Sequence, residues 1–168
     1  TAPEFQVHVL ERIRAAGRSH SLRLCGMRAL NALRLEKGYG SWGREFSVDY
    51  TPAEAGLGRF VRLDKGEFIG RDAAKRILDE PPKRRLAIFA LDAGDVDPMG
   101  NEPILMNGEV VGRLTSGGFG FHVKHPIGLG YVRRDVADQV EIEILGERRR
   151  ARILTEPPYD PEGRRLRM

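Results

Sequence analysis

Histidine and cysteine, two residue types that often carry catalysis or metal binding, are sparse in this chain of 168 residues, with four and one respectively. His122 and His125 are three residues apart, and no third ligand follows at a spacing typical of a zinc site. Cys25 is the only cysteine and falls in a predicted helix, where a lone cysteine is typical of a small buried side chain. The sequence therefore predicts neither a metal centre nor a thiol nucleophile.

A glycine-rich stretch, Gly117-Gly118-Phe119-Gly120, is the other pattern that could hold a charged ligand. Dinucleotides bind where such a loop joins a strand to the N-terminus of a helix. We expect this stretch to lie between strands, so it lacks that geometry and predicts no dinucleotide fingerprint. The glycines are more typical of a sharp turn or of close backbone approach.

Basic side chains exceed acidic ones and give the chain a formal net charge of +4, which favours anionic partners without identifying them. The basic residues gather at residues 83–85, 148–152 and 164–167. Most such groups are solvated faces, but a basic barrel that binds RNA is one alternative. We expect no nucleic-acid partner, because the aromatic pairs on which single strands stack are missing from this basic face.

Hydropathy and cysteine content indicate the environment of the chain. Its longest apolar runs, such as residues 86–91, are far shorter than the roughly 20 residues of a membrane-spanning helix, so we expect no membrane partner. A single cysteine excludes an internal disulfide and favours a reducing compartment. We therefore expect a cytoplasmic location.

Helical patterns dominate the first half of the chain. Apolar residues recur at helical spacing over residues 3–16, 26–35 and 70–80. A proline suits the first turn of the first helix, and glycines or prolines follow the ends of all three. Thr51 and Glu54 stand at capping-box spacing with Pro52 between them, which predicts the start of a short helical turn.

The period changes after Pro81-Pro82, where we place the boundary between a domain of residues 1–82 and one of residues 83–168. Short β-prone segments follow, separated by turn residues. They lie at residues 85–91, 102–106, 109–114, 128–132, 139–144 and 148–154. Asn107-Gly108 predicts a tight hairpin turn. A run of strands without helices between them favours an antiparallel barrel or sandwich.

The helical half has almost no strand to cover its apolar faces. An apolar face left in water costs about 25 cal/mol per Å². The helices therefore pack on the barrel or on sequence outside this chain. We favour the second interpretation, because the chain opens on Thr1-Ala2-Pro3-Glu4, which is more typical of a cut than of a natural start.

Three motifs run through the helical half at fixed separations. Residues 33–39 read LRLEKGY, residues 51–57 read TPAEAGL, and residues 65–71 read KGEFIGR. With them the chain resembles the folate-dependent aminomethyltransferases. That family includes the T-protein of the glycine cleavage system and the C-terminal folate domains of dimethylglycine and sarcosine dehydrogenases.

The second half resembles the C-terminal domain of the same family through further segments. They are GNEPI at residues 100–104, VGRLTSG at 111–117 and GLGYV at 128–132, with PYDP at 158–161 closer to the dehydrogenase branch. The resemblance implies an α+β chain. Its helical remnant of a central folate-binding domain, incomplete in this chain, precedes a six-stranded, jelly-roll-like antiparallel β-barrel.

The resemblance also assigns a role to Glu36, which matches the glutamate that grips the pterin in this family. A pterin presents its 2-amino group and a ring N–H side by side, so one carboxylate accepts two parallel hydrogen bonds. Tyr39 and Trp42 would supply a flat wall beside the ring, or serve as packing anchors. Without the resemblance, Glu36 would be interpreted as an exposed partner in an ion pair.

Basic residues are also implied around the glutamate tail of a folate. By a looser match we assign this role to Lys65, Arg71 and Arg164. Structural ion pairing is an equal alternative for the first two, because Asp64 and Glu67 are close in sequence.

The activity implied is transfer of a one-carbon unit from an amine-derived donor to tetrahydrofolate, which gives 5,10-methylenetetrahydrofolate. The protein would hold the reacting atoms together and exclude water. The aspartate that assists proton movement in this family belongs to the N-terminal half of the folate domain and has no counterpart here. We therefore assign no catalytic residue and expect the chain alone to be inactive. A missing folate half, and a flavin domain in the dehydrogenase branch, would complete it.

A second hypothesis keeps the superfamily but not the catalysis. The chain would then be a folate-binding regulatory protein related to those that maintain iron–sulfur clusters. Those proteins carry a Lys-Gly-Cys signature where this chain has Lys65-Gly66-Glu67, so we rank this hypothesis second.

Overall fold

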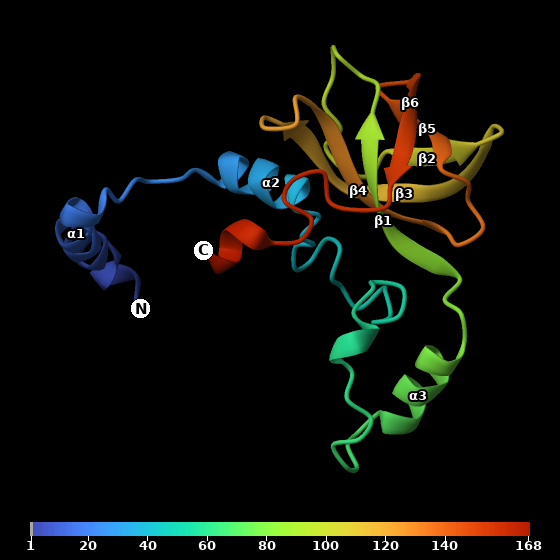
Figure 1. Cartoon of the computed structure of the whole chain (residues 1–168), viewed down its shortest axis with the longest axis horizontal. Helices are drawn as coiled ribbons and strands as arrows, with labels where there is room; N and C mark the ends of the chain where they lie inside the picture. The colour runs from blue at the N-terminus through green and yellow to red at the C-terminus, as the bar shows by residue number, and fades with distance from the viewer. Residues whose placement is uncertain (1) are drawn as a thin grey trace. The chain divides into compact units, whose positions relative to one another are not determined.

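The computed structural model describes residues 2–168 (Figure 1). By the contacts between its residues the chain forms two compact units, one that ends at Leu30 and one that begins at Asn31. The first unit holds the short 3-10 helices Pro3–Phe5 and Arg18–His20 and, between them, α1 (Gln6–Gly17). The helix expected over residues 3–16 is thus confirmed. The apolar side chains of this segment are exposed, among them Phe5 and Val7.

The second unit contains a closed barrel of antiparallel strands. They are β1 (Arg84–Leu91), β2 (Pro103–Met106), β3 (Glu109–Gly120), β4 (His125–Arg133), β5 (Gln139–Ile144) and β6 (Glu147–Leu154). Around the barrel the strands follow the order β1-β4-β3-β2-β5-β6, so every strand has two neighbours and no edge is left unpaired. The barrel expected from the sequence is confirmed, and all six predicted segments are strands.

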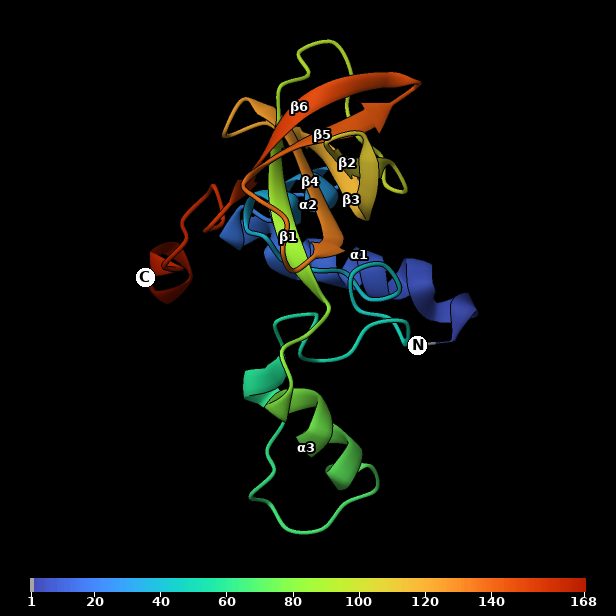
Figure 2. The same ribbon diagram turned by 90° about the vertical axis from the view of Figure 1, so that its right-hand side faces the viewer.

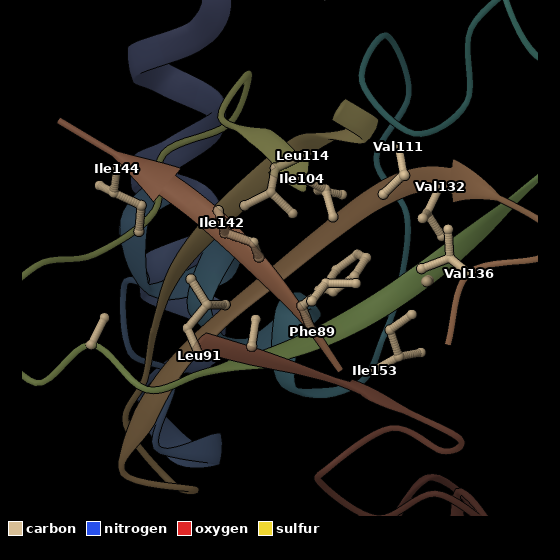
Figure 3. Close-up of a cluster of buried hydrophobic side chains, with 14 residues drawn as sticks. Phe89, Leu91, Ile104, Val111, Leu114, Val132, Val136, Ile142, Ile144 and Ile153 are labelled. Atoms are coloured by element: carbon tan, nitrogen blue, oxygen red, sulfur yellow. The ribbon is translucent and has the colours of Figure 1, made fainter. Parts of the chain in front are cut away.

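Alternating side chains fill the barrel. Along β5 every second residue is buried, and Ile142 has no exposed surface. Phe89 and Leu114 reach the same cluster from β1 and β3, and Figure 3 shows these side chains converging on one another. Successive side chains of a strand point to opposite faces, so the buried residues of β5 are those that face the inside of the barrel.

Two tight hairpins set the register of the barrel. Asn107 and Gly108 adopt positive φ angles of 53° and 82° between β2 and β3, as the sequence predicts. Leu145 and Gly146 repeat this conformation between β5 and β6, with φ angles of 53° and 83°. Because hairpin length fixes the register, each strand presents its apolar residues to the core.

The end of helix α2 (Met27–Glu36) packs on the outside of the barrel (Figures 1 and 2). Leu35 is fully buried with Ile127 and Leu129 of β4. Downstream are the 3-10 helix Gly58–Phe60, α3 (Arg71–Asp79) and a C-terminal 3-10 helix, Arg164–Arg167. The helices expected over residues 26–35 and 70–80 are confirmed. At Thr51 the capping-box hydrogen bonds form, but the segment makes a turn rather than a helix.

Two predictions about local environment are wrong. Cys25 precedes α2 and is exposed, because the helix begins only at Met27. The glycine-rich stretch lies inside β3 instead of between strands, so β3 is longer than expected. Its role in close approach is nonetheless confirmed at Gly117, where an added Cβ would stand 2.6 Å from the carbonyl oxygen of Pro98.

Candidate functional site

The carboxylate of Glu36 lies at the end of α2, and only 3% of the residue is exposed. Its Oε1 accepts hydrogen bonds from the backbone N–H groups of His122, at 2.6 Å, and Val123, at 3.2 Å. Its Oε2 accepts none from the described residues. The site therefore holds one carboxylate oxygen in place and leaves the other available to a ligand.

Gly120 allows the loop of residues 121–124 to come this close to α2. A Cβ at Gly120 would stand 2.6 Å from Cγ2 of Val123, 2.7 Å from Cδ1 of Ile127 and 3.1 Å from Oε1 of Glu36. The first two distances are shorter than any relaxed carbon contact. Glycine at this position is therefore a condition for the hydrogen bonds to the Glu36 carboxylate.

The segment of residues 155–163 lies against the same end of α2. The N–H of Tyr159 donates to the backbone oxygen of Glu36 at 3.1 Å. Its ring meets the His122 ring edge-on, with 4.5 Å between the centroids. These contacts bring the loop after β3 and the C-terminal segment together at Glu36, the last residue of α2. The motif that contains Tyr159 was noted in the sequence, but nothing in its spacing indicated this neighbour.

An ion pair fastens the C-terminal segment beside Tyr159. The ammonium of Lys37 donates to the backbone oxygen of Asp160 at 2.5 Å and lies 3.2 Å from its Oδ2. Partial removal from water opposes ionisation of Asp160, but the hydrogen bond and the charge of Lys37 outweigh it and lower the pKa of this carboxyl. The carboxylate of Asp160 is therefore ionised at neutral pH.

A second acid, Glu45, is completely buried beside β3, although the sequence drew no attention to it. One oxygen accepts from Thr115 Oγ1 at 2.6 Å and from Ser116 Oγ. The other accepts from the Ser41 N–H at 2.7 Å and from Arg34 Nη1 at 2.9 Å. Four donors from three segments thus converge on one carboxylate.

These contacts keep Glu45 ionised. Burial by itself would raise the pKa of the carboxyl. The hydrogen bonds, with the charge of Arg34, outweigh burial and hold the pKa of Glu45 below its ordinary value. Burial conversely lowers the pKa of Arg34, against the pull of the carboxylate. An arginine this far from its titration range stays protonated, so both partners carry charge.

The other sequence-predicted residues do not contact the Glu36 carboxylate. Trp42 is 89% exposed and Tyr39 is 51% exposed, so neither is a packing anchor in the described part of the chain. Lys65 lies over the Phe68 ring, with its Nζ 4.4 Å from the centroid. The ligand contacts assigned to these three residues stay predictions.

The remaining two predicted basic residues are occupied by local partners. Arg71 donates to the backbone oxygen of Leu63 at 3.2 Å and lies 3.5 Å from Glu67. Arg164 pairs with Glu162. Structural ion pairing is therefore present at Arg71, and a role in binding stays a prediction for both.

The polar groups of the site indicate which class of ligand it could bind. Among residues 2–168, no three His, Cys, Asp or Glu side chains gather in a way that would hold a metal ion. No described helix is long and apolar enough to cross a membrane. A carboxylate with one open oxygen suits a neutral or cationic group with N–H donors.

Family comparisons match both halves of the chain. Residues 84–160 match the glycine cleavage T-protein C-terminal barrel domain, and residues 1–65 match the GCVT N-terminal domain. A solved structure, the glycine cleavage system aminomethyltransferase T of Bartonella henselae, is 26% identical with a TM-score of 0.80. The superposition covers 93% of this chain and 44% of that one.

Two curated relatives are longer proteins. Mouse mitochondrial dimethylglycine dehydrogenase is 43% identical over 169 residues, which cover 98% of this chain and 19% of the relative. The mouse mitochondrial pyruvate dehydrogenase phosphatase regulatory subunit is 35% identical over 147 residues, or 84% of this chain and 17% of the relative. The chain thus spans about a fifth of the length of either protein.

Proposed function

Because this chain belongs to the glycine cleavage T-protein family, we propose that it is the C-terminal portion of a folate-dependent aminomethyltransferase. Tetrahydrofolate is the acceptor, and its N5 and N10 take up the one-carbon unit of an amine-derived donor to give 5,10-methylenetetrahydrofolate. The likeness to dimethylglycine dehydrogenase over 98% of the chain favours a dimethylglycine or sarcosine dehydrogenase-like enzyme.

The Glu36 carboxylate is the observation that carries this proposal. A pterin offers an amino group and a ring N–H in one plane, and a carboxylate accepts such a pair. Oε1 already accepts from the amides of His122 and Val123, whereas both acceptor positions of Oε2 are open. A carboxylate oxygen can accept two hydrogen bonds, so the residues present fit the pterin edge with Oε2 as the acceptor of both its donors.

Neighbouring residues would orient the ligand and exclude water. The backbone N–H groups of His122 and Tyr159 both hydrogen-bond to Glu36, and their rings pack edge-on against each other, so one of these rings would contact a flat heterocycle bound there. The exposed Trp42 and Tyr39 can contact the ring or its benzoyl extension. An acceptor held in one orientation reacts with the bound one-carbon unit as if both were parts of one molecule, so no collision in solution is needed. Exclusion of water protects the transferred carbon from hydrolysis.

Basic residues farther along the chain would bind the glutamate tail of the folate. Lys65 faces solvent and has no ion pair within the described residues, whereas Arg71 and Arg164 already pair with Glu67 and Glu162. The carboxylates of the tail would replace these local partners. Exchange of one exposed carboxylate for another costs little, because exposed ion pairs contribute only about 0–1 kcal/mol.

We propose further that additional sequence completes the enzyme. The relatives are several times longer than this chain, and the apolar face of α1 is exposed. The missing part supplies the N-terminal half of the folate domain, the group that assists proton movement and, in the dehydrogenase branch, a flavin domain. The chain alone is then inactive. We propose a cytoplasmic location because the single cysteine of this chain forms no disulfide within it, which suits a reducing compartment.

Substitution of the pterin-binding acid tests the proposal. In the full-length protein, Glu36→Gln replaces one acceptor oxygen by a donor. Calorimetric titration with tetrahydrofolate under anaerobic conditions should show about tenfold to hundredfold weaker binding, since a hydrogen bond to a charged group contributes about 1.5–3 kcal/mol. The matched control, Glu109→Gln, alters an exposed glutamate paired only with Arg133 and should bind normally. Undiminished affinity in the Glu36 variant would contradict the proposal.

A regulatory protein of the same superfamily is the second candidate. The observation in its favour is the 35% identity to a protein whose name describes a regulatory subunit. Both candidates bind folate through Glu36, but only the enzyme forms 5,10-methylenetetrahydrofolate from an amine donor. The full-length protein is therefore assayed with tetrahydrofolate, an electron acceptor and a panel of N-methylated amines. If it binds tetrahydrofolate but forms no product with any of these amines, the second candidate is favoured.

A further inference from the structure

Polar contacts fasten helix α2 to β3 and to the loop after it at two places. At the end of the helix, the Glu36 carboxylate accepts from the two amides of the loop. Earlier in the helix, Arg34 meets β3 through Glu45, and Asn31 meets it directly at the carbonyl of Gly117. We call this second set the Glu45 network. Its members are Asn31, Arg34, Ser41, Glu45, Thr115, Ser116 and the carbonyl of Gly117.

Arg34 is the link between the helix and the buried acid. Its Nη1 donates to Glu45 at 2.9 Å, while Nε and Nη2 donate to Asn31 Oδ1 at 3.0 and 2.7 Å. Asn31 in turn donates through Nδ2 to the carbonyl of Gly117 at 3.3 Å. One face of α2 is therefore tied to three consecutive residues of β3, 115–117, by hydrogen bonds.

Glu45 also fixes the loop that follows α2. Its carboxylate accepts from the Ser41 N–H, and its backbone oxygen accepts from the hydroxyl of Tyr131 at 2.8 Å. Tyr131 is a buried residue of β4 that stacks on Tyr50, with 3.5 Å between ring centroids. The acid is thus held on both sides and cannot shift without disturbing two strands of the barrel.

The hydrogen bonds at Glu36 and the Glu45 network are coupled, because both connect the same helix to the same strand and loop. Arg34 and Glu36 are two residues apart on one helix, so their backbones are separated by about 3 Å along its axis. On the other side, Ser116 precedes the loop of residues 121–124 within the same strand-loop unit. A helix that slides on β3 therefore moves the Glu36 carboxylate away from the amides of His122 and Val123.

We propose that Glu45 is a positioning residue for ligand binding by Glu36, which it places through Arg34 and Asn31 on one side and Thr115 and Ser116 on the other. This inference rests on the proposed function. Glu45 does not touch the ligand. A buried carboxylate with four donors has one low-energy arrangement, because any displacement leaves a charge or a donor unpaired.

The test compares Glu45→Gln with a matched substitution, Glu54→Gln, in the full-length protein. Glu54 is also buried and also paired with an arginine, but its carboxylate contacts only Thr51 and Arg84. We expect Glu45→Gln to weaken tetrahydrofolate binding about tenfold, since a displaced Glu36 carboxylate loses part of a charge-assisted hydrogen bond, which is worth about tenfold to hundredfold in affinity. Glu45→Asp, which keeps the charge, should recover part of the loss. Glu54→Gln should bind like the unmodified protein.

Amide hydrogen exchange supplies a readout that does not need the ligand. In Glu45→Gln, the amides of His122 and Val123 should exchange faster, while the barrel amides of Ile142 and Ile153 keep their protection. If Glu45→Gln fails to fold, Thr115→Val removes one donor to Glu45 and should give the same pattern at smaller amplitude.

The outcomes separate this inference from the proposed function. Normal affinity and unchanged exchange in a folded Glu45→Gln, or in Thr115→Val, would overturn the positioning role. An equal loss in Glu54→Gln would overturn it too, because the effect would then be general destabilisation. If instead Glu36→Gln binds normally, the proposed function fails, while exchange at His122 and Val123 still decides whether Glu45 positions the Glu36 carboxylate.

Discussion

At the scale of single residues, the site depends on close approach as much as on charge. The Glu36 carboxylate is held by two backbone amides that follow β3, and these reach it only because residue 120 has no side chain. An acid gripped by backbone amides stays in place when side chains around it move. The position of the Glu36 carboxylate therefore depends on Gly120, although the two residues are 84 positions apart in the sequence.

Replacement of Gly120 by alanine tests this dependence. The added Cβ would stand 2.6 Å from Val123 and 2.7 Å from Ile127, so the loop must shift. We expect Gly120→Ala to lower the free energy of unfolding by about 1–3 kcal/mol, the usual cost of overpacking, and to weaken protection of the His122 amide. Urea unfolding and hydrogen exchange measure the two effects.

Gly94 supplies the control for that substitution. An added Cβ there would meet nothing within 4 Å, so Gly94→Ala should leave stability within about 0.5 kcal/mol of the unmodified protein. If Gly120→Ala is as stable as Gly94→Ala and its His122 amide stays protected, the close approach is not a requirement of the site.

At the scale of elements, the C-terminal segment is held beside the site by a few polar contacts. Lys37 donates to Asp160, which also accepts from the N–H of Arg164 at 2.9 Å. Because the pKa of Asp160 is lowered in the folded chain, these contacts stabilise the segment at pH values above the ordinary value of 3.8. Their contribution is lost as the pH falls through the lowered pKa.

Removal of the lysine charge should release the segment. In Lys37→Met at pH 7, we expect trypsin to cleave after Arg164 and Arg165 several times faster, since local opening exposes the peptide. The control is Asp64→Asn, which breaks an exposed pair with Arg62 elsewhere in the chain. Mass spectrometry of timed digests gives the rates. Equal rates in Lys37→Met and the unmodified protein would show that the ion pair does not hold the segment.

Local patterns explain how much of these elements the sequence reveals. The strands follow from short β-prone segments bounded by turn residues, and the two predicted turns follow from Asn107-Gly108 and Thr51-Pro52, which are signals within a few residues. Glu36 stands out through its motif. Its amide partners do not, since they lie 86 and 87 residues away. Glu45 was missed because it follows a non-periodic loop, and its burial arises only when β3 supplies Thr115 and Ser116.

The glycine stretch of β3 shows the same limit. Three glycines in four residues indicate a turn by local rules, yet here they permit a strand to pass close to another backbone. Gly117 approaches Pro98, and Gly118 lies near Leu35 and Asn31 of α2, with an added Cβ 3.3 Å from the leucine side chain. Only tertiary structure distinguishes these two uses of glycine.

At the scale of the whole molecule, the distribution of charge separates a folate enzyme from an RNA-binding barrel. The net charge of +4 is modest, and the arginine run of β6 is partly neutralised. Arg149 lies 2.9 Å from Asp95 and 2.6 Å from Glu147, while Arg148 lies within 3.9 Å of Glu141. Arg148 and Arg149 are thus held by acids, so within this run Arg150 and Arg152 are the arginines left to contact phosphates.

We therefore expect weak, nonspecific affinity for nucleic acid. Fluorescence titration of the full-length protein with a single-stranded RNA of about 16 nucleotides, a length that suits an oligonucleotide-binding barrel, should give no saturable binding at 150 mM salt. Any binding at 50 mM salt should fall steeply, because release of counterions dominates such complexes. Tetrahydrofolate affinity should fall much less steeply over the same range, since the Glu36 carboxylate contacts uncharged N–H donors and only the glutamate tail depends on exposed ion pairs, which salt screens. Saturable RNA binding at the higher salt concentration, lost on substitution of Arg150 and Arg152, would instead assign the barrel face to nucleic acid.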